Sequence, residues 1–440
     1  MKTDLIYGIE DRPPFKDAFF AALQHLLAIF VAIITPPLII AGALKLDVEK
    51  TGFLVSMSLF ASGVSTFIQC RRIGPIGAKL LCIQGTSFSF IGPIIATGMV
   101  GGLPLIFGVC MAAAPIEMII SRTFRYMRNI ITPLVSGIVV LLIGLSLIKV
   151  GIVSCAGGFG AMDNGTFGSW ENLSIAGSVL LSVLFFNRCS NKYLRMSSIV
   201  LGLCLGYALA FTLGKVDMSA LNPSMLMSFN IPQPFKYGLD FNISSFIAIG
   251  LVYLITAIEA TGDVTANSMI SGLDIKGEKY MKRVSSGVLA DGFNSLLAGV
   301  FNSFPNSIFA QNNGIIQLTG VASRYVGYYI AAMLVLLGLF PIVGAVFSLM
   351  PDPVLGGATL LMFGTVAAAG IRIISSQNIG RKETLVLAVS LSLGLGVELM
   401  PDVLKNAPEA IRSIFASGIT TGGLTAIIAN AVIRVKEENQ

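Results

Sequence analysis

Charged residues are scarce in this sequence. Asp, Glu, Lys and Arg make up 12% of the 440 residues, whereas an ordinary soluble domain carries about 25%. Mean hydropathy is +0.82, and apolar stretches such as 19–44 and 245–271 exceed the roughly 20 residues that a helix needs to span a bilayer. These features exclude an ordinary soluble domain and predict an all-α polytopic membrane protein.

Metal-ligating residues are scarce as well. His25 is the only histidine, and the six cysteines are scattered without a CxxC pair. Zinc and haem sites need such ligands at close spacing, so we expect no metal and no cofactor. Residues 1–17 are too polar for a cleaved signal peptide.

Fourteen membrane spans are predicted from the apolar segments. They are residues 19–44, 51–70, 80–98, 101–121, 131–152, 173–187, 197–214, 245–271, 284–300, 311–322, 325–350, 353–371, 384–400 and 411–433. With this topology, 22 of the 29 Lys and Arg residues fall on the side that holds both termini. The positive-inside rule therefore predicts a cytoplasmic (inner) membrane protein with both termini cytoplasmic. The same bias accounts for the net charge of +6, so no nucleic acid partner is expected.

The two halves of the chain contain an internal repeat. Residues 131–152 and 351–372 align without gaps at an offset of 220 residues, half of the chain length, and one proline and two glycines coincide. Each half would hold seven spans, an odd number, so the second half starts on the opposite side of the membrane. Such inverted repeats are typical of secondary transporters, which bind substrate near the midplane between the repeats. A duplication without transport is the alternative.

Two predicted spans are interrupted at corresponding places in the two halves. The third span contains "IQGTSFSFIGPII" (83–95), which is rich in Gly and Ser and includes a Gly-Pro pair. The tenth span contains "FAQNNGIIQLTG" (309–320), with four carboxamides within seven residues. Non-helical backbone at membrane depth persists only where protein or an aqueous cavity satisfies it. The substrate site is therefore expected where these segments meet.

Ionisable residues inside spans are functional candidates, because burying them is costly. Glu259 and Asp263 are four residues apart and share a helix face. Two charged carboxylates at that spacing repel, which favours proton binding by one of them. Structural hydrogen bonds are the alternative for both residues. Asp291, in mid-span, is a candidate proton relay or a structural acid, and Glu117 could pair with the interfacial Arg122.

His25, inside the first span, suits a structural hydrogen bond or proton transfer. In the broken spans, Gln311 can donate and accept hydrogen bonds in one plane, as carboxamides do with adenine. Glu259 could accept N–H groups from the same ring, and Phe88 or Phe90 could stack on it. A nucleobase-like ring fits these groups, although a sugar or an amino acid could use similar ones.

The tenth span also carries a family signature. Gln311-Asn312-Asn313-Gly314, four residues, then Thr319-Gly320 matches [Q/E/P]-N-x-G-x4-T-[R/K/G]. With "EDRPPF", "QPFKYG" and "GGLTAI", this chain resembles the nucleobase–ascorbate transporter (nucleobase:cation symporter-2) family over nearly its whole length, in particular the bacterial xanthine:proton symporters.

The resemblance implies an architecture. It implies two inverted seven-span repeats, with short strands in the broken spans 3 and 10, assembled as a homodimer. The predicted divisions are a cytoplasmic tail 1–18, core-domain segments 19–121 and 245–350, gate-domain segments 131–214 and 353–433, and a cytoplasmic tail 434–440.

The resemblance also implies roles for individual residues. Glu259 and Gln311 would bind the purine, together with backbone near Ser87 and Phe88. Asn312 and Asp291 match further positions that are important for transport, His25 matches a supporting histidine, and the signature comprises Gln311, Asn312, Gly314, Thr319 and Gly320. Asp263 falls where uracil-type relatives carry histidine, so its direct contact with substrate stays open. Ser87 varies with purine preference, which leaves urate open beside xanthine.

We therefore expect proton-coupled uptake of a purine nucleobase, most simply xanthine, by alternating access of a core domain against a gate domain. The partners would be the purine, protons, the lipid bilayer and a second copy of the chain; the proton is the coupling ion and no covalent step is needed. Urate or another purine or uracil is the alternative substrate. Two other classes of protein are an anion transporter of related fold and a membrane-embedded enzyme such as a prenyltransferase. The enzyme would need paired aspartate-rich motifs to hold Mg²⁺ pyrophosphate.

Overall fold

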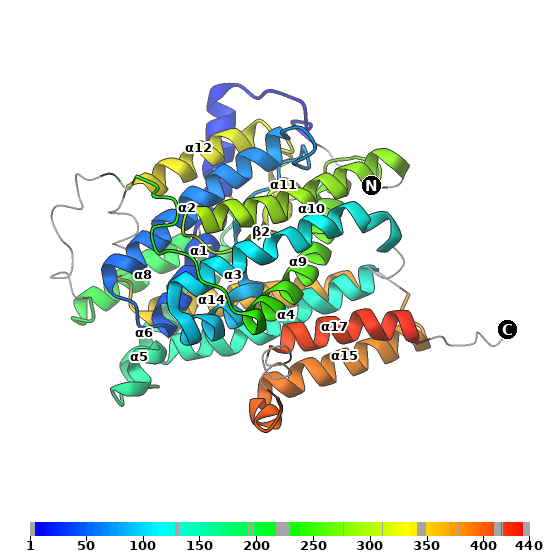
Figure 1. The fold of residues 1–440 in the computed structure, drawn as a ribbon. Helices are drawn as coiled ribbons and strands as arrows, with labels where there is room; N and C mark the ends of the chain where they lie inside the picture. Colours follow the sequence, from blue (N-terminus) through cyan, green and yellow to red (C-terminus); the bar gives the residue numbers. More distant parts are fainter. Residues whose placement is uncertain are drawn as a thin grey trace.

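The protein is described here by a computed structural model (Figure 1). It describes residues 5–127, 132–191, 194, 198–216, 229, 231–275, 277–309, 311–340, 349–375, 378–408, 415 and 417–433. The fold is mostly helical, with two short strands. The predicted C-terminal tail 434–440 lies outside the described residues.

The first half runs from a pair of long helices, through a short strand, to further helices. Its elements are α1 (Phe15–Ala43), α2 (Val48–Arg71), β1 (Gln84–Thr86), the 3₁₀ turn η1 (Phe88–Phe90), α3 (Ile91–Met127), α4 (Pro133–Cys155), α5 (Gly158–Asp163), α6 (Trp170–Arg188) and α8 (Ser198–Thr212).

The second half has a similar order of element types. Its elements are α9 (Ile243–Ile270), α10 (Gly277–Val300), β2 (Asn306–Ile308), α11 (Gln311–Thr319), α12 (Val326–Leu339), α14 (Asp352–Ser375), α15 (Arg381–Leu399), the 3₁₀ turn η4 (Pro401–Leu404) and α17 (Gly418–Val432). In both halves, two long helices precede a three-residue strand, and a helix begins shortly after it.

Six helices among the described residues are long and apolar enough to cross a membrane: α1, α2, α3, α4, α9 and α14. Three shorter apolar helices, α8, α12 and α17, add to them. The chain is therefore a multi-pass membrane protein. The exact count of fourteen spans stays a prediction.

The third and fourth predicted spans differ in detail from the structure. Residues 80–90 contain no α-helix, and α3 runs from Ile91, within the third predicted span, through the fourth to Met127. At Gly101 and Gly102 the backbone leaves helical geometry, with φ +65° at Gly102. A positive φ suits glycine because it has no Cβ. One kinked helix thus replaces two separate ones.

The structure contains two groups of helices (Figure 1). In one group, α1, α2, α3, α9, α10 and α12 surround the strand pair. In the other, α4 packs along α14, with α15 and α17 beside them. A Cβ on Gly144 of α4 would collide with the backbone of Ala367 in α14, and one on Gly370 of α14 with the backbone of Leu141. Small residues of this kind let membrane helices approach closely.

The two strands form an antiparallel pair that joins the halves of the chain. Gln84 pairs with Ile308, Gly85 with Ser307 and Thr86 with Asn306. All six residues are buried. Because their backbone groups bond to each other, non-helical chain is tolerated inside the bundle. The prediction of a short strand in the third span is confirmed, whereas β2 lies just before the predicted tenth span, 311–322.

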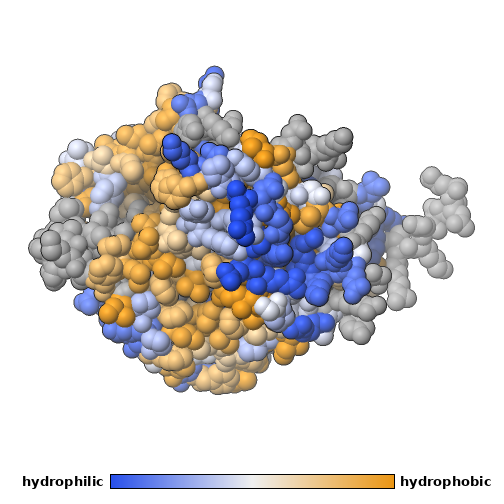
Figure 2. Space-filling view, turned by 90° about the horizontal axis from the view of Figure 1, so that it is seen from above, coloured by the Kyte–Doolittle hydropathy of each residue, from blue (hydrophilic) through white to orange (hydrophobic). Residues whose placement is uncertain are grey.

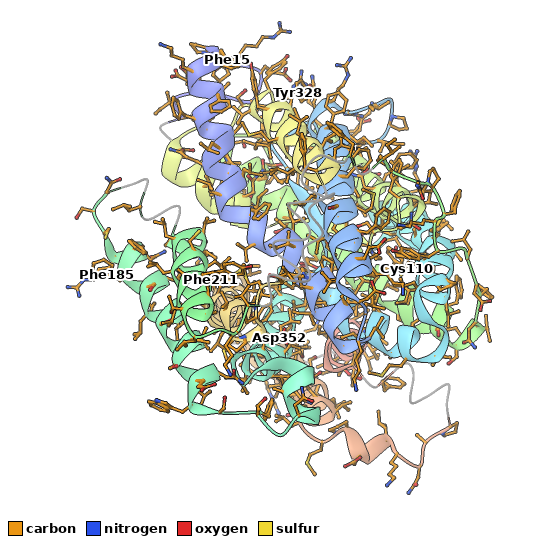
Figure 3. All side chains as sticks on the ribbon, turned by 90° about the vertical axis from the view of Figure 1, so that its left-hand side faces the viewer. Phe15, Cys110, Phe185, Phe211, Tyr328 and Asp352 are labelled. Atoms are coloured by element: carbon orange, nitrogen blue, oxygen red, sulfur yellow. The ribbon has the colours of Figure 1, made fainter. Side chains whose placement is uncertain are left out.

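Large apolar side chains lie on the outside of the molecule. Phe185 and Phe211 are 67% and 56% exposed and lie in the part of Figure 3 occupied by α6 and α8. Figure 2 shows broad hydrophobic areas beside a hydrophilic region on one face. Contiguous apolar surface of this kind is expected where a protein faces lipid.

Candidate functional site

The predicted substrate residues come together beside the strand pair. Glu259, on α9, accepts a hydrogen bond from the Ser89 hydroxyl of η1, with 3.1 Å between Oγ and Oε2. Ser87 caps η1, because its Oγ accepts from the amide of Ser89 at 3.3 Å. The Ser87 amide donates to the carbonyl oxygen of Pro305, just before β2, at 2.9 Å. The broken third segment is thereby attached to both α9 and the second half of the chain.

Gly85 lets the chain pass close to its neighbours at this point. A Cβ there would lie 2.6 Å from the ring of Phe309 and 2.8 Å from Ile33 of α1. A side chain would push apart the strand pair or α1. The Gly-rich composition of this segment is therefore explained by close packing as well as by the loss of helix.

The signature segment follows β2 directly. Gln311 is the first residue of α11, so its backbone starts a helix beside the site, but its side chain lies outside the described residues. Asn312 Nδ2 donates to the carbonyl oxygen of Leu81 at 2.5 Å. Asn267 Nδ2, from α9, donates to the same oxygen at 2.9 Å and to Asn313 Oδ1 at 3.0 Å. The amides of the signature thus connect the segment before β1 to α9.

These contacts assign a structural role to Asn313, which sequence reasoning left without one. They also identify Asn267, which the sequence analysis did not single out. A buried Asn within a predicted membrane span was the available signal, since such a group needs partners. His25 of α1 is buried and lies near the side chain of Asn312 of the signature; its supporting role stays a prediction.

Asp291 is fully buried on α10 and is held by a second amide network. Gln84 Nε2 donates to Asp291 Oδ1 at 2.5 Å, and Asn294 Nδ2 donates to Gln84 Oε1 at 2.8 Å. The Gln84 amide in turn donates to Thr66 Oγ1 of α2 at 3.0 Å. Gln84 therefore joins the strand pair to two helices, and sequence reasoning did not identify it.

Glu117 does not pair with an interfacial arginine as the sequence suggested. Its side chain is fully buried on α3, and neither carboxylate oxygen has a hydrogen-bond partner among the described residues. Arg122 is exposed and forms no ion pair with a described carboxylate. Glu117 instead faces Asp291, because α3 and α10 approach closely at Gly292, where a Cβ would be 3.1 Å from that of Glu117.

Asp263 is also buried, one helical turn beyond Glu259 on α9. Its Oδ2 has no hydrogen-bond partner among the described residues. The structure thus brings four carboxylates of α3, α9 and α10 into one region. Glu117, Asp263 and Asp291 are buried and Glu259 is partly buried, and acids at such positions are costly when charged without a cationic partner.

Phe88 and Phe90 have different surroundings. The Phe88 ring meets that of Phe363 on α14, with centroids 5.4 Å apart at 84°. Phe90 packs on Tyr253 of α9, with centroids 4.7 Å apart. Phe88 therefore lies between the two groups of helices, whereas Phe90 belongs to the interior of one group.

Further polar atoms around the strand pair lack a described hydrogen-bond partner. Thr86 Oγ1, Ser307 Oγ and Asn312 Oδ1 are buried and have no hydrogen-bond partner among the described residues. Buried polar groups normally find partners. Together with the Glu259 carboxylate and the Phe88 ring, they suit a planar ligand with N–H donors and carbonyl acceptors.

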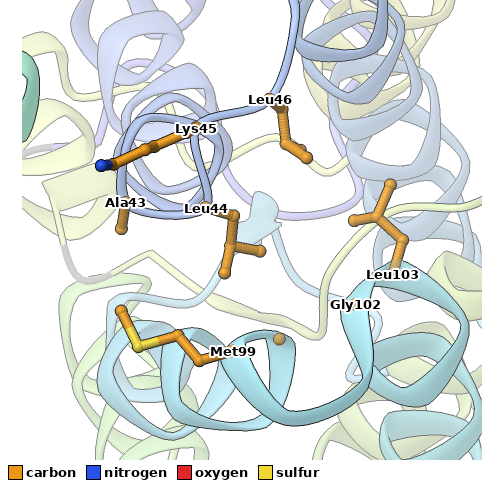
Figure 4. A pocket seen from close by; sticks show the side chains of 8 residues that line it. Ala43, Leu44, Lys45, Leu46, Met99, Gly102 and Leu103 are labelled. Atoms are coloured by element: carbon orange, nitrogen blue, oxygen red, sulfur yellow. The ribbon is translucent and has the colours of Figure 1, made fainter.

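A cavity of about 330 Å³ lies elsewhere, between the end of α1 and the kink of α3 (Figure 4). Its lining is largely apolar, with Leu44, Leu46, Met99 and Leu103, and Lys45 at its edge. No predicted site residue lines it. We therefore place the candidate site at the strand pair and not in this cavity.

Comparisons with known proteins show the family of this chain. The sequence profile of the Permease family (Xan_ur_permease) matches residues 16–403. Xanthine permease XanP of Escherichia coli is 50% identical to this chain over 98% of it and 95% of XanP. Xanthine permease XanQ of the same organism is 48% identical over 98% of this chain and 94% of XanQ. Uric acid permease PucJ of Bacillus subtilis is 34% identical over 96% of this chain and 94% of PucJ.

The chain therefore belongs to the nucleobase–ascorbate transporter family. It is a transporter and not an enzyme. The resemblance drawn from the signature is confirmed.

Solved structures share the fold at low sequence identity. The transmembrane domain of the cyanobacterial bicarbonate transporter BicA superposes with a TM-score of 0.58 at 14% identity, covering 92% of this chain and 99% of that one. Murine Slc26a9, an anion transporter, superposes with a TM-score of 0.63 at 11% identity, covering 96% of this chain and 69% of that one. These similarities establish a transporter fold and carry no information on substrate.

Proposed function

We propose that this chain is a proton-coupled purine permease with xanthine as its substrate. The observation that carries the proposal is the Glu259 carboxylate, held by Ser89 beside the strand pair, in a chain 50% identical to a xanthine permease. Xanthine presents N–H donors and carbonyl acceptors around a planar ring. Glu259 accepts from ring N–H groups, Gln311 donates and accepts at the opposite edge, and Phe88 contacts the ring face.

Proton coupling is supported by the acids inside the helix bundle. Glu259, Asp263 and Asp291 lie on two adjacent helices, and the cost of charging them together falls when one binds a proton. In the proposed cycle, a proton binds this group while the site is open to the outside. Xanthine then binds to Glu259 and Gln311, and the proton and xanthine are released on the inside. The proton is the coupling ion, and no cofactor takes part.

Alternating access is proposed as movement between the two groups of helices. The core domain comprises 19–121 and 245–350, and the gate domain comprises 131–214 and 353–433, as two inverted seven-span repeats. The contact of Phe88 with Phe363 lies at the boundary between them, so access to the site changes when this contact opens. The protein works in the cytoplasmic membrane as a homodimer, with both termini cytoplasmic.

A substitution at Glu259 tests the proposal. Glu259→Gln keeps the size of the side chain and an acceptor for Ser89 but removes the negative charge. We expect it to abolish uptake of labelled xanthine in cells without their own purine uptake, with an unchanged amount of protein in the membrane. Glu398→Gln is the matched control, since the Glu398 carboxylate, on α15, accepts from the amide of Gly418 at the start of α17 and belongs to no part of the proposed site. This variant should transport normally.

The coupling is tested separately. A protonophore should stop accumulation by the wild type, and accumulation that persists would exclude proton symport. Normal uptake by Glu259→Gln would exclude the proposed binding role.

Urate is the second candidate substrate, because PucJ is a uric acid permease at 34% identity. Ser87 is the N-cap of η1, and its backbone amide bonds to the second half of the chain, so substitution of its side chain can change the pocket without breaking this link. Ser87→Ala and Ser87→Asn should change the ratio of xanthine to urate uptake more than the amount of protein in the membrane. An unchanged ratio would assign specificity to other residues.

A further inference from the structure

A second cavity, of about 680 Å³, lies at the end of the bundle where α1 begins. It is lined by Arg12, Pro13, Arg71, Arg72, Arg324, Tyr325, Tyr328 and Tyr329. These residues come from the chain before α1, the end of α2 and the start of α12. Figure 3 shows Phe15 of α1 and Tyr328 of α12 at the same end of the molecule. No residue of the purine site lines this cavity.

Four guanidinium groups and no carboxylate line the cavity. Of these four arginines, only Arg324 forms an ion pair with a described carboxylate, that of Glu10, whose Oε2 is 2.9 Å from Nη2. Arg12, Arg71 and Arg72 have no described carboxylate within ion-pair distance. The cavity thus has an excess of positive charge that a bound anion would neutralise.

Tyrosine side chains hold the arginines in place. The guanidinium carbons of Arg12 and Arg324 lie 4.8 and 4.4 Å from the centroid of the Tyr325 ring. Arg324 Nη1 donates to the hydroxyl of Tyr328 at 2.6 Å, and Nη2 donates to that of Tyr325 at 2.9 Å. Stacked guanidinium groups lose less freedom when they bind an anion, and Arg is suited to bidentate contacts with phosphate.

The positive-inside rule alone does not explain this arrangement. It requires basic residues on one side of the membrane, and exposed, separated side chains satisfy it. Here the cations converge on one hollow, where they repel each other. Convergent arginines around a cavity indicate an anionic ligand.

The surroundings of the cavity favour a ligand at the membrane surface. Phe15 is 67% exposed, and its ring meets that of Tyr329 with centroids 6.0 Å apart. Phe19 and Phe20 continue this exposed aromatic surface along α1. Aromatic side chains beside basic ones are typical of the membrane–water interface. A lipid whose phosphate occupies the cavity could extend its acyl chains along α1.

We propose that this cavity is a binding site for a phosphate group, carried either by an anionic membrane phospholipid or by free phosphate. The phosphate oxygens accept hydrogen bonds from Arg12, Arg71 and Arg72, and Arg324 with its tyrosines forms the wall. The bound anion joins α1, α2 and α12 at one end of the bundle and thereby stabilises the core group of helices.

The test measures binding to the purified, full-length protein. Phosphatidylglycerol, phosphatidylcholine and inorganic phosphate are added separately, and bound lipid is counted by native mass spectrometry while thermal stability is followed. We expect phosphatidylglycerol to bind at least about tenfold more tightly than phosphatidylcholine, which has no net charge, and to raise the unfolding temperature. Stabilisation by inorganic phosphate to the same extent would assign the site to free phosphate.

The double variant Arg12→Gln/Arg71→Gln identifies the cavity as the site. Both side chains are exposed, so folding is expected to be retained. Binding should weaken about tenfold or more. The control is Arg122→Gln, which changes an exposed arginine near the C-terminal end of α3 and should leave binding unchanged. Equal anion binding by the double variant and the wild type, or no binding of either phosphatidylglycerol or phosphate to the wild type, would overturn the proposal.

Discussion

Gln84 is the side chain whose removal tests most directly how the halves of the chain are joined. It is fully buried in β1 and donates to Asp291 while accepting from Asn294. Gln84→Met keeps the length of the side chain and removes both hydrogen bonds. A buried group that loses its partner costs about 1–3 kcal/mol, and two partners are affected, so we expect a loss of about 2–6 kcal/mol. Even a loss of about 2 kcal/mol changes the ratio of folded to unfolded protein roughly 30-fold.

Heat stability of the detergent-purified protein is the assay, read as the fraction that remains monodisperse after heating. Gln24→Met is the control, because Gln24 is only half-buried on α1 and should change stability little. Asp291→Asn should keep the fold, since an amide oxygen still accepts from Gln84, while removing the group proposed to bind protons. If Gln84→Met were as stable as the control, the reasoning that the amide network joins β1 to α10 would be refuted.

Three further predictions concern packing, charge and the signature. Gly144→Val should destabilise the α4–α14 contact by about 1–3 kcal/mol, whereas Gly364→Ala, where a Cβ meets no atom within 4 Å, should be tolerated in the same heating assay. The hydrogen bond from Arg324, with Lys79 as a second cation, holds the pKa of Glu10 below its usual range. At a pH above the ordinary glutamate pKa, this ion pair therefore stabilises the attachment of the N-terminal segment. The stabilisation is lost as the pH falls through the lowered pKa of Glu10. Limited proteolysis of that segment should increase on acidification, and Glu10→Gln should remove the change. Asn267→Ala should lower heat stability by about 1–3 kcal/mol, and unchanged stability would show that its two hydrogen bonds do not contribute.

Much of the fold could be predicted from the sequence, because membrane spans are determined by local composition. Hydropathy located α2 as 51–70 and α9 as 245–271, close to Val48–Arg71 and Ile243–Ile270. The Gly-Pro pair and the run of amides also marked where helix is interrupted, and β1 and β2 lie in or beside these segments. The predicted boundary between the spans 80–98 and 101–121 lies next to Gly101 and Gly102, where the structure has a bend within the single helix α3 and not a gap between two helices.

The partners of buried polar groups could not be predicted in this way. Glu117 was assigned to an arginine near it in sequence, yet it faces Asp291 on another helix. Which face of a membrane helix turns inward is poorly encoded when nearly all of its side chains are apolar. The contact is decided by how closely α3 and α10 approach at Gly292.

The sequence by itself determined the class of the protein, the interrupted segments and, through the signature around Gln311, the family. These depend on hydropathy, on glycine, proline and amide content, and on a short motif, all of which are local. Only the tertiary structure decided that Ser89 holds Glu259, that Gln84 holds Asp291 and that arginines of three segments converge on one cavity. Each joins residues far apart in the chain, and their proximity depends on helix packing, which no local pattern encodes.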